Sequence, residues 1–148
     1  MNLHNQVYRN AMSTPMIIDS PTKRIDPTKL VDNFITEYYQ TVSNIGWNNT
    51  ASLYFPDACI IVRDRIIGNH HEFVSLLTKK YIKRANYGRW RIKWVVGSDD
   101  QIVLNVYGTI QVVNFLEVLY DVENFTETFI LKQSDDMKLK INVQMLDF

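Results

Sequence analysis

The sequence has 148 residues, a length typical of a single domain. It carries 16 basic and 16 acidic residues, and this zero net charge excludes a global attraction to nucleic acid or to an anionic membrane. The single cysteine, Cys59, excludes an intrachain disulfide and is typical of a reducing compartment. No run reaches the roughly 18 apolar residues of a membrane span, and no secretory signal opens the chain, so we expect an intracellular protein.

Residues 1–25 have no sustained periodicity and are interrupted by prolines and hydroxyl residues, so we expect a flexible N-terminal leader. The domain is predicted to cover residues 26–148. It begins where Asp26 can cap a helix whose first residue is Pro27. One apolar stripe then follows at helical spacing, formed by Leu30, Val31, Phe34, Ile35, Tyr38 and Val42.

Two more helices and a short hairpin are predicted next. A short helix is expected within residues 48–55, capped by Asn48 or Asn49, and a strand over 58–64 turns back at Asp64. Asn69 and Glu72 have capping-box-like spacing and open a helix within 69–84.

From residue 87 the hydrophobic period changes to two, which predicts four long strands over 87–96, 101–113, 124–133 and 137–146. Helices followed by consecutive long strands are typical of an α+β fold with a mainly antiparallel sheet. We expect helices to cover one face of this sheet. The other face must then meet solvent, a ligand or a second subunit.

Several motifs occur in an order and spacing that resemble a known family. They are "FITEYYQ" (34–40), "ASLYFPDACI" (51–60), Gly68 before a helix, "VYGTI" (106–110) and "FTETFIL" (125–131). Over residues 28–148 the chain resembles the nuclear transport factor 2-like family. The resemblance implies a cone in which a curved, mainly antiparallel sheet wraps around three helices and dimerises through the sheet.

The resemblance also implies partners and alternatives. The transport factor of the family carries Ran-GDP past nucleoporins with FxFG repeats, and a relative pairs with the messenger-RNA export receptor. The wider superfamily includes small-molecule isomerases and dehydratases, and other members are RNA-granule proteins. We predict no metal site and no cofactor.

The stretch 112–124 is longer than the corresponding family loop, and it is apolar. Exposed, it would form a docking patch for a partner protein. The alternative is that it covers the open end of the cone or lengthens a hairpin. The predicted partner-binding residues are Phe115, Leu116, Leu119, Tyr120 and Glu123.

Strand alternation places Glu127 on the same face as Phe125, Phe129 and Leu131. Buried charges are usually paired, so we expect Glu127 to pair with Arg89 or Arg91 of a neighbouring strand or subunit. The predicted dimer-interface residues are Arg89, Arg91, Glu127 and Phe129. The alternative is that Glu127 is an acid in a substrate pocket.

An enzyme would need a carboxylate or histidine facing Tyr38 or Tyr39 inside the cone. The nearest candidates in chain order are Asp57, Asp64 and His70, and none belongs to a visible catalytic constellation. We therefore predict no catalytic residue; Tyr38, Tyr39 and Asp64 are the residues of the enzyme alternative.

Seven basic residues lie between Lys79 and Lys93, which raises the alternative of an RNA-associated scaffold. Alternation puts Trp90 and Trp94 on the face opposite to Arg89 and Arg91, so nucleic-acid binding is not expected. Our leading hypothesis is a non-enzymatic transport adaptor of cytoplasm and nucleus. It would bind Ran, nucleoporins or an export receptor as a homodimer, with a heterodimer as the alternative.

Overall fold

The computed structural model describes residues 26–148, so the predicted leader over 1–25 lies outside the described residues. The first described helix, α2 (Pro27–Asn44), starts where the sequence predicts, because the Asp26 carboxylate accepts the Thr28 N–H at 3.0 Å. The short helix that follows, η2 (Trp47–Leu53), is a 3-10 helix and begins after Gly46, not after Asn48 or Asn49. Gly46 has φ +135, and a Cβ there would lie 2.6 Å from the Lys83 carbonyl oxygen.

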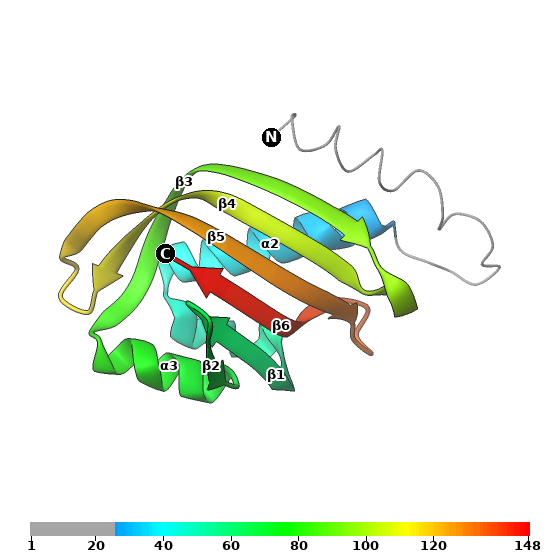
Figure 1. Ribbon diagram of the computed structural model, residues 1–148, viewed down its shortest axis with the longest axis horizontal. Coiled ribbons are helices and arrows are strands. Elements are labelled where there is room, and N and C mark those ends of the chain that lie inside the picture. The colour runs from blue at the N-terminus through cyan, green and yellow to red at the C-terminus, as the bar shows by residue number, and fades with distance from the viewer. Residues whose placement is uncertain (1–25) are drawn as a thin grey trace.

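The described residues form a six-stranded sheet in the order β2-β1-β6-β5-β4-β3 (Figure 1). Its strands are β1 (Tyr54–Val62), β2 (Arg65–Gly68), β3 (Ile82–Val96), β4 (Ile102–Asn114), β5 (Leu119–Gln133) and β6 (Leu139–Asp147). Only β1 and β6 pair in parallel; the other neighbours are antiparallel. This confirms the predicted α+β class and mainly antiparallel sheet.

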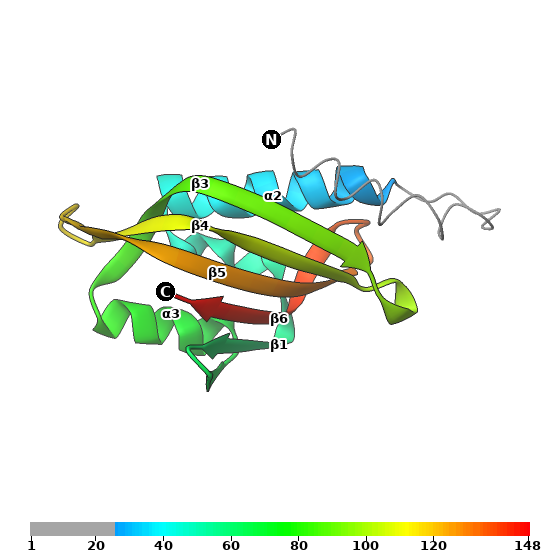
Figure 2. The ribbon, with the colours of Figure 1, turned by 45° about the horizontal axis from the view of Figure 1, so that its top comes forward.

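Helix α3 (His70–Lys79) and the 3-10 turn η3 (Ser98–Asp100) complete the described elements. Asn69 and Glu72 form the predicted capping box of α3. The curved sheet wraps around the helices, and α2 runs behind β3, β4 and β5 (Figures 1 and 2). No helix within residues 26–148 is long and apolar enough to cross a membrane.

The inner face of the sheet packs on α2, η2 and α3 and forms one core. In β3 the predicted alternation is confirmed for residues 91–94: Ile92 and Trp94 are buried, and Arg91 and Lys93 are exposed. A bulge between Gly88 and Arg91 interrupts the alternation.

The stretch 112–124 is not a loop over the cone but part of a long hairpin. β4 continues to Asn114, β5 already starts at Leu119, and residues between them make the turn. The hairpin projects beyond the end of β6 (Figures 1 and 2). Of the two alternatives to a docking loop, the lengthened hairpin is therefore the observed structure.

Candidate functional site

The carboxylate of Glu127 lies inside the cone, where the side chain is 1% exposed. Its Oε1 accepts a hydrogen bond from the Tyr39 hydroxyl at 2.6 Å, and its Oε2 accepts one from the Gln144 amide and a longer one, 3.5 Å, from Tyr38. Tyr38 and Tyr39 are consecutive on α2, whereas Gln144 comes from β6. Three side chains from two elements thus donate to the carboxylate of a third element, β5.

Gln144 connects this carboxylate to one further hydroxyl, that of Tyr54. Its Nε2 also donates to Tyr38 Oη at 2.9 Å, and its Oε1 accepts from Tyr54 at 2.6 Å. Burial raises the pKa of Glu127 to about 7, although the hydrogen bonds from Tyr39, Gln144 and Tyr38 oppose the rise. Burial also raises the pKa of Tyr38 and of Tyr39, so both phenols are neutral donors at physiological pH.

The expected pairing of Glu127 with Arg89 or Arg91 is wrong. From Phe125 to Leu131 the odd-numbered residues of β5 face α2 and are buried within one chain, whereas Arg91 is exposed on the outer face of the sheet. Glu127 and Phe129 therefore cannot lie in an interface formed by that outer face. An interface role for Arg89 and Arg91 stays a prediction.

The carboxylate that faces the two tyrosines is Glu127, not one of the three candidates taken from chain order. Asp64 lies in the exposed turn between β1 and β2 and has φ 66. Asp57 is also exposed. His70 contacts the Trp47 carbonyl and Thr50 Oγ1 at the start of α3. The signal that could have found the site was the alternation that put Glu127 on the apolar face.

Aromatic rings fill the cone around this network. Centroids of Phe34 and Phe129 lie 5.3 Å apart, and those of Tyr39 and Tyr87 lie 4.8 Å apart. Further rings at the same place are those of Tyr38, Trp90 and Phe125. The packing leaves Glu127 closed off from solvent in this conformation.

Two pockets lie elsewhere on the described surface. One of about 170 Å³ lies between η2, α3 and the hairpin and includes Trp47, Leu77 and Phe115. One of about 240 Å³ lies at the start of α2 and includes Leu30 and Phe34. Both are smaller than the roughly 300–1,000 Å³ typical of small-molecule sites. Within residues 26–148, no group of three His, Cys, Asp or Glu side chains could hold a metal ion.

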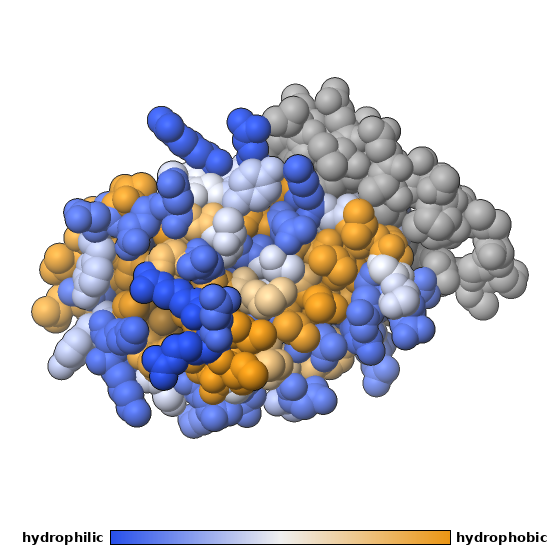
Figure 3. Space-filling model, viewed as in Figure 1, coloured by the Kyte–Doolittle hydropathy of each residue, from blue (hydrophilic) through white to orange (hydrophobic). Residues whose placement is uncertain are grey.

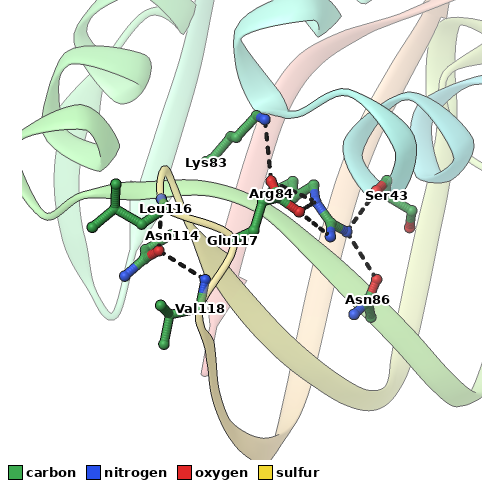
Figure 4. Close-up of polar contacts among 8 residues, drawn as sticks. All are labelled: Ser43, Lys83, Arg84, Asn86, Asn114, Leu116, Glu117 and Val118. Carbon is green, nitrogen blue, oxygen red and sulfur yellow. Dashed lines mark hydrogen bonds and ion pairs between the residues drawn. The ribbon is translucent and has the colours of Figure 1, made fainter.

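A polar clamp holds the tip of the β4–β5 hairpin (Figure 4). Glu117 accepts from Arg84 Nη2 at 2.7 Å and from Lys83 Nζ at 3.2 Å. Arg84 in turn donates to the Ser43 carbonyl at 3.0 Å and to Asn86 Oδ1 at 3.1 Å. The tip is thereby tied to β3 and to the end of α2.

Asn114 orders the turn from inside, because its Oδ1 accepts the N–H groups of Leu116 at 2.8 Å and Val118 at 3.0 Å (Figure 4). Hydrogen bonds from Arg84 and Lys83 lower the pKa of Glu117 to about 2. The hairpin is thus an ordered element with its own polar contacts.

The side chains that this hairpin presents are largely apolar. Leu116 is 83% exposed, and the exposed apolar residues of the hairpin are Phe115, Leu116, Val118, Leu119, Tyr120 and Val122. Apolar atoms appear at this end of the molecule in Figure 3. The structure places the five predicted partner-binding residues, Glu123 included, on this one exposed hairpin; their binding role stays a prediction.

A second apolar surface lies on the outer face of the sheet. Val95 and Met145 are exposed there, and Val103, Ile130 and Val143 are half-buried neighbours in the ladders. Apolar atoms surrounded by hydrophilic ones are visible on this face in Figure 3. The alternation of β3 puts Arg91 and Lys93 on the same face.

No protein-family model matches the sequence, and no curated protein matches it. Among solved structures the chain is similar to nuclear transport factor 2 from Cryptosporidium parvum, with a TM-score of 0.68 and 16% identity over 85% of this chain and 98% of that one.

Two further structures show how varied the similar proteins are. One is a putative dehydratase of the NTF2-like family from Streptomyces avermitilis, with a TM-score of 0.62, 10% identity and coverage of 81% and 94%. The other is the yeast UBP3-associated protein BRE5, with a TM-score of 0.58, 14% identity and coverage of 83% and 96%. The fold thus occurs in enzymes and in non-enzymes. These likenesses, together with the cone geometry, show that residues 26–148 adopt the nuclear transport factor 2-like fold.

Proposed function

We propose that the protein is a non-enzymatic adaptor that binds protein partners and acts in nucleocytoplasmic transport. One observation carries the proposal: the cone is filled by aromatic rings, while an ordered hairpin exposes six large apolar side chains. An enzyme of this fold would need the opposite arrangement, with an open cavity and an accessible acid or base.

The order of the hairpin supports a binding role. Exposure of the Leu116 side chain to water does not stabilise the free protein. Exposed apolar patches of this kind mark interaction sites. The clamp of Glu117 on Arg84 and Lys83 holds the hairpin in one conformation before a partner arrives. Pre-organisation of this kind reduces the entropy that binding costs.

The partners we propose are Ran-GDP, FxFG-bearing nucleoporins or an export receptor, and the resemblance to the transport factor supports them. We further propose a homodimer through the outer face of the sheet, where Val95 and Met145 are exposed on the same face as Arg91. Such a protein would work in the cytoplasm and the nucleus.

A binding titration tests this function. The purified chain is titrated with Ran-GDP, with an FxFG nucleoporin fragment and with an export receptor, each read by calorimetry. We expect at least one to bind, and Leu116→Asp to weaken that binding at least tenfold. Ile66→Asp is the matched control, because Ile66 is 76% exposed, close to the 83% of Leu116, but lies on β2. No binding by any of the three, or an equal loss in both variants, would contradict the proposal.

One observation favours a second candidate, a cavity enzyme: the Glu127 carboxylate has a pKa of about 7 and contacts two neutral phenols. Such a group can exchange protons near neutral pH. The cone would have to open for a substrate. A titration with cyclic ketones, read by tyrosine fluorescence in the wild type and in Glu127→Gln, tests it: binding that depends on Glu127 would favour the enzyme over the adaptor.

A further inference from the structure

A small apolar pocket lies where η2, α3, the start of β3 and the tip of the β4–β5 hairpin meet. Its volume is about 170 Å³. Among its apolar lining residues, Trp47 and Leu77 are buried, Val74 and Ile82 are half-buried, and Phe115 is 46% exposed. The lining therefore runs from the core to the surface, and the pocket opens toward solvent.

Backbone contacts hold the walls of this pocket together. The Phe115 N–H donates to the Tyr81 carbonyl at 3.3 Å, which joins the hairpin tip to the connection between α3 and β3. Figures 1 and 2 place these two segments at the same end of the molecule. Gly46 also lines the pocket, and the Lys83 carbonyl approaches it at a point where a Cβ would collide. The pocket is thus formed before a partner binds.

Basic residues are concentrated in the chain segment that borders the pocket, and they are Lys79, Lys80, Lys83 and Arg84. Lys83 lines the pocket, and Lys79 directly follows the lining residue Thr78. Within residues 26–148, the carboxylate that pairs with members of this group is Glu117, which bonds to Lys83 and Arg84 (Figure 4). Lys79 and Lys80 form no ion pair with a residue of that range. Positive charge therefore exceeds negative charge beside the pocket.

The size of the pocket fits one apolar side chain of a partner. A cavity of about 150 Å³ lined by Leu, Ile and Phe side chains is large enough to bind benzene, whereas sites for whole small molecules usually measure roughly 300–1,000 Å³. A pocket of about 170 Å³ therefore accommodates the side chain of one leucine or phenylalanine. Single anchors that fill such pockets supply much of the binding energy of protein interfaces.

We propose that this pocket binds an acidic segment of a partner protein, with one leucine or phenylalanine side chain inside it. The anchor contacts Trp47, Leu77 and Phe115, and aspartate or glutamate side chains next to it pair with Lys79 and Lys80. The anchor supplies most of the affinity, and the charges supply specificity and fast association. The inference rests on the proposed adaptor function and names the chemistry of its partner.

Charge and shape argue against other occupants. The 25 N-terminal residues of this chain contain one acidic residue, Asp19, against Arg9, Lys23 and Arg24, so they do not complement a basic edge. The phosphates of a nucleic acid match the charge but leave the apolar pocket unfilled. An acidic segment with an apolar anchor satisfies both features at once.

Matched peptides test the two parts of the proposal. The probe is the fluorescent peptide Ser-Asp-Glu-Leu-Glu-Asp-Ser, titrated into the full chain and read by anisotropy. One control peptide has alanine in place of leucine, and the other has lysines in place of the four acids. Because each control removes one part of the recognition, we expect both to bind at least about tenfold more weakly than the probe. Equal binding of the leucine and alanine peptides, or no binding of the probe at about 1 mM, overturns the proposal.

Variants of the chain locate the site. Phe115→Ala removes one wall of the pocket and is expected to weaken the probe at least about fivefold. Lys80→Glu is expected to weaken the probe by a similar factor and to improve binding of the lysine peptide. The matched control is Lys29→Glu, which reverses the charge of an exposed lysine at the opposite end of α2 and is expected to stay within about twofold. An equal loss in the two charge variants would mean general attraction and would overturn the proposal.

Amide chemical shifts show which surface the probe occupies. We expect the probe to shift the amide resonances of Thr78, Ile82 and Phe115. The resonances of Leu30 and Lys138, in the pocket at the start of α2, are expected to stay unchanged. The largest shifts at that second pocket would contradict the proposal.

Competition and sedimentation test the other occupants. Displacement of the probe by phosphatidylserine vesicles or by an RNA oligonucleotide would show that an anionic membrane or a nucleic acid takes the site. Dissociation of a self-associated form by the probe would show that a second copy takes it. Each of these results overturns the proposal, and we expect none of them.

The result for this pocket is separate from the result for the transport role. If Ran-GDP, the nucleoporin fragment or the export receptor binds but the probe does not, the proposed function stands and the pocket inference fails. If only the probe binds, the pocket inference stands and the transport role fails.

Discussion

The cone interior and the β4–β5 hairpin each combine apolar side chains with one bonded glutamate, and the two glutamates behave in opposite ways. Glu127 is buried and bonded by phenols and an amide, and its pKa is raised to about 7. Glu117 is at the surface and bonded by Arg84 and Lys83, and its pKa is lowered to about 2. Around Glu127, the hydrogen bonds of neutral donors lower the pKa by less than burial raises it. Around Glu117, desolvation is small, and the hydrogen bonds of two cations lower the pKa far below its ordinary value.

The difference separates the roles of the two regions. In the interior, the aromatic rings pack around the carboxylate, and the closed packing withholds both from any partner. On the hairpin, the ion pairs order the backbone while Leu116 and its neighbours remain free to make contacts. Variants in the two regions should therefore affect different measurements.

The largest effect is expected for Phe129→Ala in the cone. Phe129 is fully buried and packs on the rings of Phe34, Tyr38 and Tyr39, so its truncation should lower the free energy of unfolding by about 3–5 kcal/mol. Denaturant titration measures this. The control is Phe115→Ala on the hairpin, where a surface truncation should change the stability by at most about 0.5 kcal/mol. Similar losses in both variants would remove the distinction between the regions.

The second effect is the pH dependence that Glu127 gives to the free energy of unfolding. The pKa of Glu127 is raised from its ordinary 4.5 to about 7, so unfolding releases a proton between these values and stability falls as pH rises through that window. The full change is roughly 3 kcal/mol. Glu127→Gln should abolish it, and should be more stable than the wild type at pH 8 but about equal to it at pH 4. Unfolding titrations across this range measure the difference. The control Glu117→Gln should show the same fall of stability with pH as the wild type. A wild type whose stability does not change between pH 4.5 and 7 would contradict the prediction.

These opposed glutamates also show how far the sequence leads. Periodicity was enough for α2, for the long strands and for the α+β class, because each of these elements has one apolar face. The motif order was enough for the cone. Alternation even put Glu127 on the apolar face of its strand, which the structure confirms.

The partners of that glutamate could not be read from the sequence. Tyr39 and Gln144 are far from Glu127 in the chain, and only the register of β5 with β6 and the packing of α2 bring them together. The expectation of an arginine partner followed the general behaviour of charges and ignored that Arg91 lies across the sheet. The hairpin stayed one of several alternatives for a related reason: apolar residues outside a period-two run look like a loop until the β4 ladder is known.

A smaller effect is expected for Asn114→Ala in the hairpin turn. The Asn114 side chain accepts two backbone N–H groups, and its removal should cost about 1 kcal/mol of local order. We expect faster amide exchange at Leu116 and Val118 and an unchanged midpoint of global unfolding. Asn105→Ala is a matched control on the outer face of the sheet, where the side chain accepts from Thr128 and bonds no backbone N–H of this turn. Unchanged exchange at both positions would mean that the ion pairs alone order the turn.

The smallest effect, and the sharpest contrast, is expected for the Glu117 clamp. The pKa of Glu117 is lowered, so the order that it gives the hairpin is present above pH 4.5 and is lost as pH falls toward 2. This is the opposite sign to Glu127, whose protonation strengthens the interior. Because Glu117 is half exposed, solvent screens the clamp and global stability should hardly change. Amide exchange at residues 115–118, extrapolated to one reference pH, should rise on acidification in the wild type and be raised at all pH values in Glu117→Gln. The contradicting result would be slower amide exchange at residues 115–118 on acidification, in parallel with the stabilised cone. The hairpin and the interior would then unfold as one cooperative unit, and the hairpin would not be a separately ordered binding element.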